Sequence, residues 1–220
     1  MAYILNIDTT TEVATVCLSK GEDVISSLQN ERQNDHASFL HTAIASIVRD
    51  SKMKWQEINA IAVSAGPGSY TGIRVGMSAA KGLCYALEIP FILLNTLEII
   101  ALSAKLKFPS PESLYCPMID ARRMEVYTSV YDFNLNEIVT HSALILQGNS
   151  FQSLLQNNTV FFVGSGSRKF SEIVKNNNAR FVEGRIEPKA LSIISSGKYQ
   201  KLLFSDIALS EPLYIKQFQG

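Results

Sequence analysis

Two short stretches of the chain carry residue types that can bind an anion. Residues 8–10 read Asp-Thr-Thr after an apolar segment, and residues 66–69 read Gly-Pro-Gly-Ser before a helical pattern. A strand, a glycine turn and a helix N-terminus can hold a phosphate, because free amide N–H groups and the helix dipole point in the same direction. The candidate phosphate or nucleotide contacts are Asp8, Thr9, Thr10, Gly66, Gly68 and Ser69.

The same residues have a plain structural interpretation. The glycines can supply positive φ in a strand-to-helix connection, and an acid followed by threonines can hydrogen-bond within a hairpin turn. The pattern matches neither GxxxxGK[ST] nor GxGxxG. Spacing alone therefore leaves both interpretations open.

The helix after this turn, expected at residues 72–88, has small residues on one side. Gly72, Gly76 and Ala80 recur every fourth residue, and each interior glycine costs about 1 kcal/mol of helix propensity. Such a stripe allows another backbone to approach closely. The wide apolar arc predicts two neighbours, the chain's own sheet and a second helix or another protein. The alternative is a deeply buried core helix.

Other segments supply the surrounding elements. Strands are expected at residues 3–7, 13–18, 24–28, 58–63 and 91–94, with helices at 35–49 and 95–105. This order of three strands, helix, strand, helix, strand, helix is the ribonuclease-H-like arrangement. The Pro- and Ser-rich residues 107–113 predict a boundary between a first lobe, residues 1–108, and a smaller second lobe, residues 109–220.

The second lobe is expected to be a degenerate copy of the first. Strands are predicted at residues 114–119, 124–131, 138–146 and 160–163, and Pro188 opens a helix that Gly197 closes.

Composition excludes several classes of protein. The chain is 46% hydrophobic and 18% charged, which predicts a folded core. Lys plus Arg equals Asp plus Glu, 20 against 20, so tight unaided nucleic-acid binding is disfavoured. No apolar run spans a bilayer, and the N-terminus reads as a strand, which predicts a cytoplasmic protein. Cys17, Cys84 and Cys116 form no CxxC pair and are expected to be buried.

The histidines do not predict a metal site. His36 and His41 lie five residues apart, which separates them by about 140° around a helix, so they cannot share one ion. The remaining histidine, His141, has no partner at HxxxH spacing. We therefore expect no catalytic metal.

Two motifs resemble a known family. SAGPGSYTGIRVG at residues 64–76 and MIDARRMEVY at residues 118–127 are similar to the bacterial TsaB family, also called YeaZ. The opening ILNIDTTTEVATVCLS and the closing EPLYIK fit the same family, so the resemblance covers nearly the whole chain.

The resemblance implies a two-lobed actin-like ATPase fold with mixed sheets, flanking helices and a shortened second lobe. It implies a non-catalytic partner of the complex that adds the N6-threonylcarbamoyl group to adenosine 37 of tRNA. The catalytic paralogue, TsaD, holds a metal through an HxxxH pair, where this chain has Thr96 and Ile100. A small ATPase, TsaE, joins the assembly, and TsaC supplies threonylcarbamoyl-adenylate. The alternatives are an M22-type glycoprotease and a stand-alone actin-like ATPase.

The resemblance also implies interface residues on the helices at residues 36–49 and 72–88. They would pair with TsaD, or with a second copy when TsaD is absent, and Gly76→Arg would abolish pairing without unfolding the lobe. The predicted interface comprises His36, Phe39, Leu40, Ala43, Ile47, Gly72, Ile73, Gly76, Met77, Ala80 and Leu83.

Two further expectations concern nucleotide and RNA. The second lobe offers Gly164-Ser165-Gly166 but no DxG phosphate loop, so no intrinsic cofactor is expected, and ATP or ADP would bind weakly or at a subunit boundary. Arg122 and Arg123 lie in a charged hairpin that is either a solvated turn with exposed ion pairs or a contact for tRNA or a partner. Otherwise tRNA is expected to be reached only through the complex.

Overall fold

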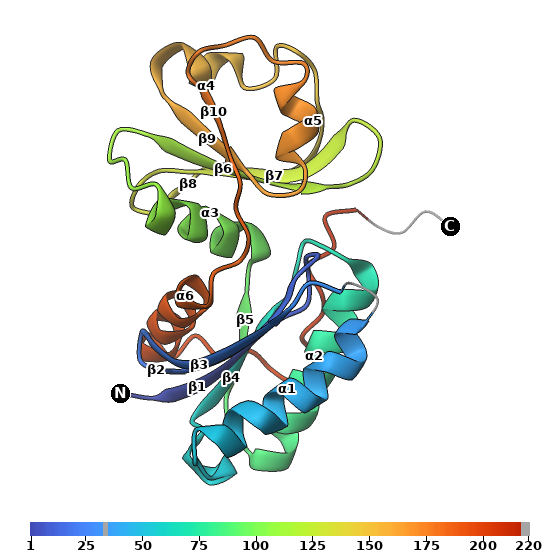
Figure 1. Ribbon diagram of the computed structural model, residues 1–220, viewed down its shortest axis with the longest axis vertical. Coiled ribbons are helices and arrows are strands. Elements are labelled where there is room, and N and C mark those ends of the chain that lie inside the picture. Colours follow the sequence, from blue (N-terminus) through green and yellow to red (C-terminus); the bar gives the residue numbers. More distant parts are fainter. Residues whose placement is uncertain (33–34, 217–220) are drawn as a thin grey trace. The chain divides into compact units, whose positions relative to one another are not determined.

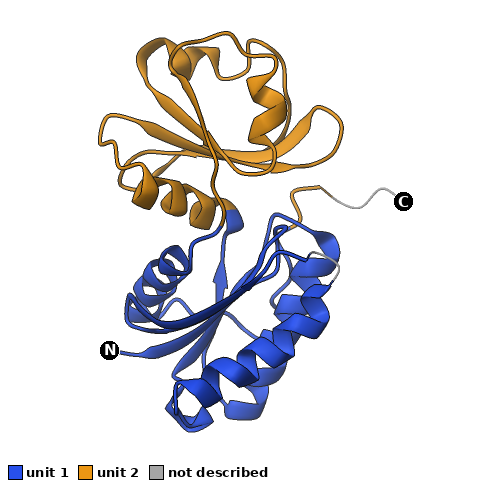
Figure 2. Ribbon diagram, viewed as in Figure 1, with its two compact units in different colours: residues 1–96, 186–213 blue, residues 97–185, 214–220 orange. Residues whose placement is uncertain are grey.

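The computed structural model describes residues 1–32 and 35–216, which form two compact units. Unit 1 contains residues 1–96 and 186–213, and unit 2 contains residues 97–185 and the chain from residue 214 (Figures 1 and 2). None of the helices in the described residues is long and apolar enough to cross a membrane.

Unit 1 is built on a five-stranded mixed sheet. Its strands are β1 (Tyr3–Asp8), β2 (Ala14–Lys20), β3 (Asp23–Asn30), β4 (Ala60–Ser64) and β5 (Phe91–Leu94), in the order β3-β2-β1-β4-β5. The first three strands are an antiparallel meander, whereas β4 and β5 run parallel to β1. Every residue of β4 is buried, as expected for an apolar strand that is covered on both faces.

Helices cover both faces of this sheet. Helices α1 (His36–Asp50) and α2 (Tyr70–Leu87) lie side by side on one face (Figure 1). Helix α6 (Pro188–Gln200) packs on the other face, where Pro188 O accepts a hydrogen bond from Cys17 Sγ at 3.6 Å. A short 3-10 helix, η2 (Trp55–Glu57), precedes β4.

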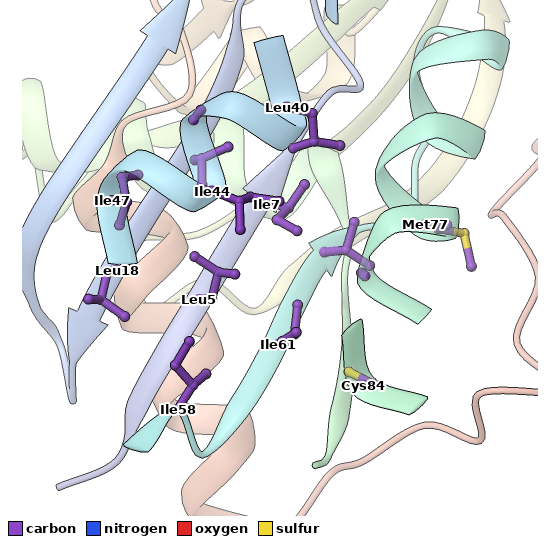
Figure 3. Close-up of a cluster of buried hydrophobic side chains, with 14 of the residues drawn as sticks. Leu5, Ile7, Leu18, Leu40, Ile44, Ile47, Ile58, Ile61, Met77 and Cys84 are labelled. Carbon is purple, nitrogen blue, oxygen red and sulfur yellow. The ribbon is translucent and has the colours of Figure 1, made fainter. Parts of the chain in front are cut away.

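The core of unit 1 lies between the sheet and the pair α1 and α2. Apolar side chains of alternate positions on the strands meet the inner faces of the two helices. Figure 3 shows this cluster, which includes Leu5, Ile7, Leu18, Leu40, Ile44, Ile47, Ile61 and Met77.

Unit 2 repeats the same sheet topology. Its strands are β6 (Leu114–Asp120), β7 (Glu125–Tyr131), β8 (Glu137–Ile145), β9 (Val160–Val163) and β10 (Ala179–Val182). The order is β10-β9-β6-β7-β8, with β6, β7 and β8 antiparallel and β9 and β10 parallel to β6. The topology agrees with the expected degenerate second copy of the first lobe.

Three helices belong to unit 2. Helix α3 (Thr96–Lys107) starts at the last residue of the first segment of unit 1, and α4 (Gln152–Asn157) and α5 (Ser167–Ser171) are short. Sequence patterns did not locate α4, α5 or β10, because each is too short to show a period. The core of unit 2 contains aromatic side chains, of which Phe162 and Phe170 make an edge contact with their ring centroids 4.9 Å apart.

The unit boundaries differ from the predicted division at residue 108. Residues 97–108 group with unit 2, and residues 186–213 return to unit 1. The return is held by hydrogen bonds across a long sequence separation, from Lys198 Nζ to Leu93 O at 2.8 Å and from Ser192 Oγ to Glu22 O at 2.6 Å. Helix α6 also continues past Gly197 to Gln200, since a single glycine lowers helix propensity without ending a helix.

Candidate functional site

The turn after β1 packs directly against the start of α2. Ser69 N donates to Thr10 O at 2.8 Å, and Thr9 Oγ1 donates to Gly72 O at 2.6 Å. Ser69 is the helix N-cap, since its side chain accepts a hydrogen bond from Gly72 N at 3.2 Å. Residues 8–10 and 66–69, predicted as one site, are therefore brought together.

Glycines make this approach possible. A Cβ at Gly68 would lie 2.3 Å from Thr10 O, one at Gly72 would lie 1.9 Å from Thr9 O, and one at Gly76 would lie 2.5 Å from Thr9 Oγ1. Side chains are not tolerated at such distances. The backbone that the glycine stripe admits is thus the β1–β2 turn of the same unit.

Asp8 lies at the centre of the cluster and is completely buried. Its Oδ1 accepts a hydrogen bond from Thr10 Oγ1 at 2.7 Å, and Thr96 Oγ1 donates to Thr10 Oγ1 at 3.2 Å. Burial raises the pKa of the Asp8 carboxyl above its ordinary value, although the hydrogen bonds that it accepts from Thr10 oppose this effect. Desolvation favours the neutral acid.

Several buried side-chain polar atoms of this cluster, one of them on the carboxyl itself, have no hydrogen-bond partner. They include Asp8 Oδ2, Ser64 Oγ and His36 Nδ1. His36 Nε2 lies 3.1 Å from Thr11 O, and because a carbonyl only accepts, Nε2 is the donor of this hydrogen bond. Asp8 Oδ2, although unpartnered, is sealed from solvent.

The cluster is closed to a phosphate in this conformation. Asp8 and Thr9 have no exposed surface, and Thr10 is 1% exposed. The amide of Ser69 donates to Thr10 O, and the amide of Thr96 donates to Gly66 O at 2.9 Å. These two amides are thus bonded within the unit, and the hydroxyl and carboxyl groups of residues 8–10 are buried, which favours the structural interpretation of this turn.

Sequence patterns missed two contributors to the cluster. Thr96 was considered only as a position that lacks a metal ligand, yet its hydroxyl joins the Asp8 network. Leu213 N donates to Ala65 O at 2.7 Å, and Leu213 O lies 2.8 Å from where a Cβ of Gly66 would stand. Gly66 has a φ of 112°, so only glycine fits there. No local signal could reveal a contact with the far end of the chain.

The predicted interface residues are mostly internal to unit 1, so most of them are not available at its surface in this structure. Phe39 and Leu83 are partly buried against the core cluster of unit 1. The others are buried: His36, Leu40, Ala43, Ile47, Gly72, Ile73, Gly76, Met77 and Ala80. The expectation that Gly76→Arg leaves the lobe folded is wrong, because Thr9, Val63 and Ile7 surround that position within 4 Å.

The outward faces of α1 and α2 carry other residues. They are small or polar apart from two exposed rings on α2, Tyr70 at 40% exposure and Tyr85 at 80%. Gly82 is exposed, and a Cβ there would meet nothing within 4 Å. The exposed positions of the two helices include Ala37, Ser38, His41, Thr42, Ala45, Thr71, Arg74 and Ser78.

Arg122 and Arg123 are exposed at the tip of the β6–β7 hairpin. Both have positive φ, 66° and 49°. Arg122 N donates to Asp120 Oδ1 at 2.6 Å, which closes the turn. No ion pair within the described residues holds either guanidinium group.

Neither metal ligands nor reactive thiols gather in the described residues. No group of three or more His, Cys, Asp or Glu side chains there could hold a metal ion. Cys17, Cys84 and Cys116 are free and buried, and burial raises the pKa of each thiol to about 12.

The two repeated sheets and their flanking helices define a protein of the actin-like ATPase fold. Two solved structures support this fold, "YeaZ from Pseudomonas aeruginosa" and another Pseudomonas aeruginosa protein described as similar to peptidase YEAZ. They superpose with TM-scores of 0.84 and 0.86 at 21% identity, over 97% and 98% of this chain and all of theirs.

The family model "TsaD: tRNA N6-adenosine threonylcarbamoyltransferase" matches residues 24–210. The chain belongs to this family, and its similarity to TsaB proteins confirms the TsaB, or YeaZ, resemblance of the sequence.

The curated relatives carry the name "tRNA threonylcarbamoyladenosine biosynthesis protein TsaB". The Bacillus subtilis protein is 32% identical over 65% of this chain, and the Escherichia coli protein is 34% identical over 61%. These matches span 62% and 57% of the relatives' own lengths. A Buchnera aphidicola relative (subsp. Schizaphis graminum) is 28% identical over 87% of this chain and 90% of its own length.

Proposed function

We propose that this chain acts in the biosynthesis of threonylcarbamoyladenosine in tRNA, as a non-catalytic partner of the metal-bearing TsaD-type subunit. The names of the curated relatives and the matched family model support involvement in this biosynthesis. The small ATPase of the TsaE type is proposed as a further member of the assembly, and the chain pairs with a second copy when the catalytic subunit is absent.

The start of α3 is the observation that carries the proposal. Thr96 and Ile100 occupy the two positions that the resemblance assigns to metal-binding histidines. Thr96 is buried, with its amide and hydroxyl bonded to Gly66 and Thr10, and Ile100 is 3% exposed. A threonine that is bonded in this way and an isoleucine provide no ligand set for a divalent cation. Catalysis by this chain alone is therefore not expected.

The outward faces of α1 and α2 are the proposed pairing surface. Their exposed residues are mostly small, so a partner backbone can approach, and Tyr85 is a large ring of the kind enriched at interfaces. Burial of roughly 800 Å² per partner would make an ordinary specific interface. The proposed surface lies on the same two helices as the predicted interface, but it consists of their exposed residues and not of their buried ones.

Nucleotide is not proposed as an intrinsic cofactor of the Asp8 cluster. The amides of Ser69 and Gly72 are bonded within the unit, and Asp8, Thr9 and Thr10 are buried. Calorimetric titration of the isolated chain with ATP and ADP is expected to give no heat of binding above background. A 1:1 isotherm that Thr10→Ala abolishes would contradict this view.

Reconstitution tests the role. The chain is mixed with the TsaD-type and TsaE-type subunits, threonylcarbamoyl-adenylate and unmodified tRNA, and modified nucleoside is measured by mass spectrometry. Product is expected only when this chain is present, and the chain alone yields none with added Zn²⁺, Fe²⁺ or Mg²⁺. Equal product without the chain would refute the role.

A matched pair of variants tests the surface. Gly82→Arg places a long side chain on the outer face of α2, whereas Gly197→Arg makes the same change on α6, where a Cβ also meets nothing within 4 Å. Gly82→Arg is expected to remove co-elution with the TsaD-type subunit, and Gly197→Arg to preserve it. Wild-type co-elution of Gly82→Arg would place the pairing surface elsewhere.

A further inference from the structure

The β6–β7 hairpin of unit 2 holds its two arginines in an unusual turn. Arg122 and Arg123 both have positive φ, a region in which glycine and asparagine are favoured over other residues. Each non-glycine residue in this region needs support from its surroundings. The turn therefore keeps two arginines where local preference would select smaller residues.

A network beneath the turn supplies that support. Lys169 Nζ donates to Asp120 Oδ1 at 2.9 Å, to Arg123 O at 2.9 Å and to Glu125 O at 2.6 Å. Asp120 N donates to Ser165 Oγ at 3.1 Å. The Lys169 side chain is 14% exposed, so it serves as an anchor of the turn. The hairpin tip is thus tied to the start of α5.

Both carboxylates of this network are paired with lysines, which leaves the arginine charges near the turn without an acidic partner in the network. Asp120 pairs with Lys169, and Glu125 pairs with Lys216 at 2.6 Å. Arg122 and Arg123 then remain exposed, together with Arg168, which precedes Lys169 on α5. No ion pair joins Arg168 to Glu172, one helical turn further on, in the described part of the chain. Local positive charge thus exists in a chain whose formal net charge is zero.

We propose that Arg122, Arg123 and Arg168 form a surface that contacts the phosphate backbone of RNA. Guanidinium groups match phosphate geometry, and the tie between the hairpin and α5 reduces the freedom that binding would remove. The inference rests on the proposed function, since that function brings tRNA to the assembly, and it names a surface of this chain that the RNA touches.

Salt dependence gives the expected size of the effect. Three phosphate contacts release counterions, so log K is expected to fall with log[salt] at a slope of about −2.1 to −2.7. Between 25 and 150 mM KCl the affinity would then drop roughly 40- to 130-fold. Such binding is weak at physiological salt, in agreement with the absence of a basic excess in the whole chain.

The test is fluorescence anisotropy of the intact chain with a labelled tRNA transcript, measured at several KCl concentrations. Arg122→Glu and Arg123→Glu are each expected to lower the slope by about 1. Arg180→Glu on β10 changes the net charge equally at another exposed position and is expected to leave the slope unchanged. Equal weakening by Arg180→Glu would overturn the assignment of the surface.

A second variant separates charge from folding. Arg122→Asn combined with Arg123→Gly places the preferred residues at the two positive φ values, so it removes both charges while the turn is retained. Its thermal unfolding temperature is expected to equal or exceed that of the wild type, and its slope to fall by about 2. Wild-type RNA affinity in this folded variant would refute the inference, as would displacement of the RNA only by polyglutamate and not by unlabelled tRNA.

The proposed function and the proposed RNA surface can be refuted independently of each other. If nucleoside formation does not need the chain but the arginine variants still weaken RNA binding, the proposed function fails and the RNA surface stands. If nucleoside formation needs the chain and the double variant supports wild-type product and RNA affinity, the RNA surface fails alone.

Discussion

Replacement of Gly76 by alanine tests whether the glycine stripe of α2 admits the β1–β2 turn. In an exposed helix this substitution stabilises by about 1 kcal/mol. Here the new Cβ would stand 2.5 Å from Thr9 Oγ1, 3.4 Å from Val63 Cγ2 and 3.6 Å from Ile7 Cγ2. Thr9 cannot rotate away freely, because its hydroxyl donates a buried hydrogen bond to Gly72 O.

The magnitude follows from two opposing effects. Overpacking of a filled core costs about 1–3 kcal/mol, and loss of a buried hydrogen bond costs a similar amount. After the gain in helix propensity, Gly76→Ala is expected to destabilise unit 1 by about 1–2 kcal/mol. Gly82→Ala, with open space around its Cβ, is expected to stabilise by about 1 kcal/mol.

The assay is urea unfolding followed by tryptophan fluorescence. Trp55 is the single tryptophan of the chain and packs against the core of unit 1, so its emission reports on this unit. The Thr9→Ala background removes the clashing hydroxyl, and there Gly76→Ala should lose most of its destabilising effect. Equal stabilisation by Gly76→Ala and Gly82→Ala would show that Thr9 does not approach α2 closely at this position.

Two further predictions concern titratable groups. The pKa of Asp8 is raised above 3.8 in the folded chain. The protonated Asp8 carboxyl therefore contributes stability below pH 3.8, and this contribution is lost as pH rises through the folded pKa. Asp8→Asn should gain stability relative to wild type as pH increases from 4 to 8. Urea unfolding at each pH measures this difference, and a constant or falling difference would contradict the protonated carboxyl. Because burial raises the pKa of Cys17, Cys84 and Cys116 to about 12, a thiol reagent at pH 8 should label none of them in the native chain and all of them in urea, and rapid native labelling of any one would refute its burial.

Local patterns were sufficient to predict most of the secondary structure. The apolar run before residue 64 and the helix after the glycine turn depend on neighbours in sequence, and the structure has β4 and α2 there. Strands β5 and β9 have the predicted bounds for the same reason.

The neighbours of each element were not predictable. A stripe of glycines indicates that something approaches closely, but not which backbone does so. The residue that fills the space beside Gly76 is Thr9, far earlier in the chain. The sequence therefore brought together the correct residues of the Asp8 cluster and left open whether they bind a ligand or one another.

Placement of the C-terminal helix shows the same limit. The residues of α6 form a helix for local reasons, with Pro188 in its first turn, but its position depends on which face of the first sheet is uncovered. Cys17 and Asn6 lie on that face, where Asn6 Nδ2 bonds Ser19 Oγ at 3.1 Å. The sequence pattern of α6 does not indicate which face of the sheet this helix covers.

The discontinuity of unit 1 has a consequence for synthesis of the chain. A ribosome synthesises residues 97–185 before residues 186–213, so the first strands of unit 2 can pair while the first sheet still lacks α6. During that interval the face around Cys17 is bare, and a nascent chain arrested at Arg185 should attract chaperones or aggregate. Synthesis of residues 186–213 then supplies α6 and completes unit 1, whose first strand was made at the start of translation.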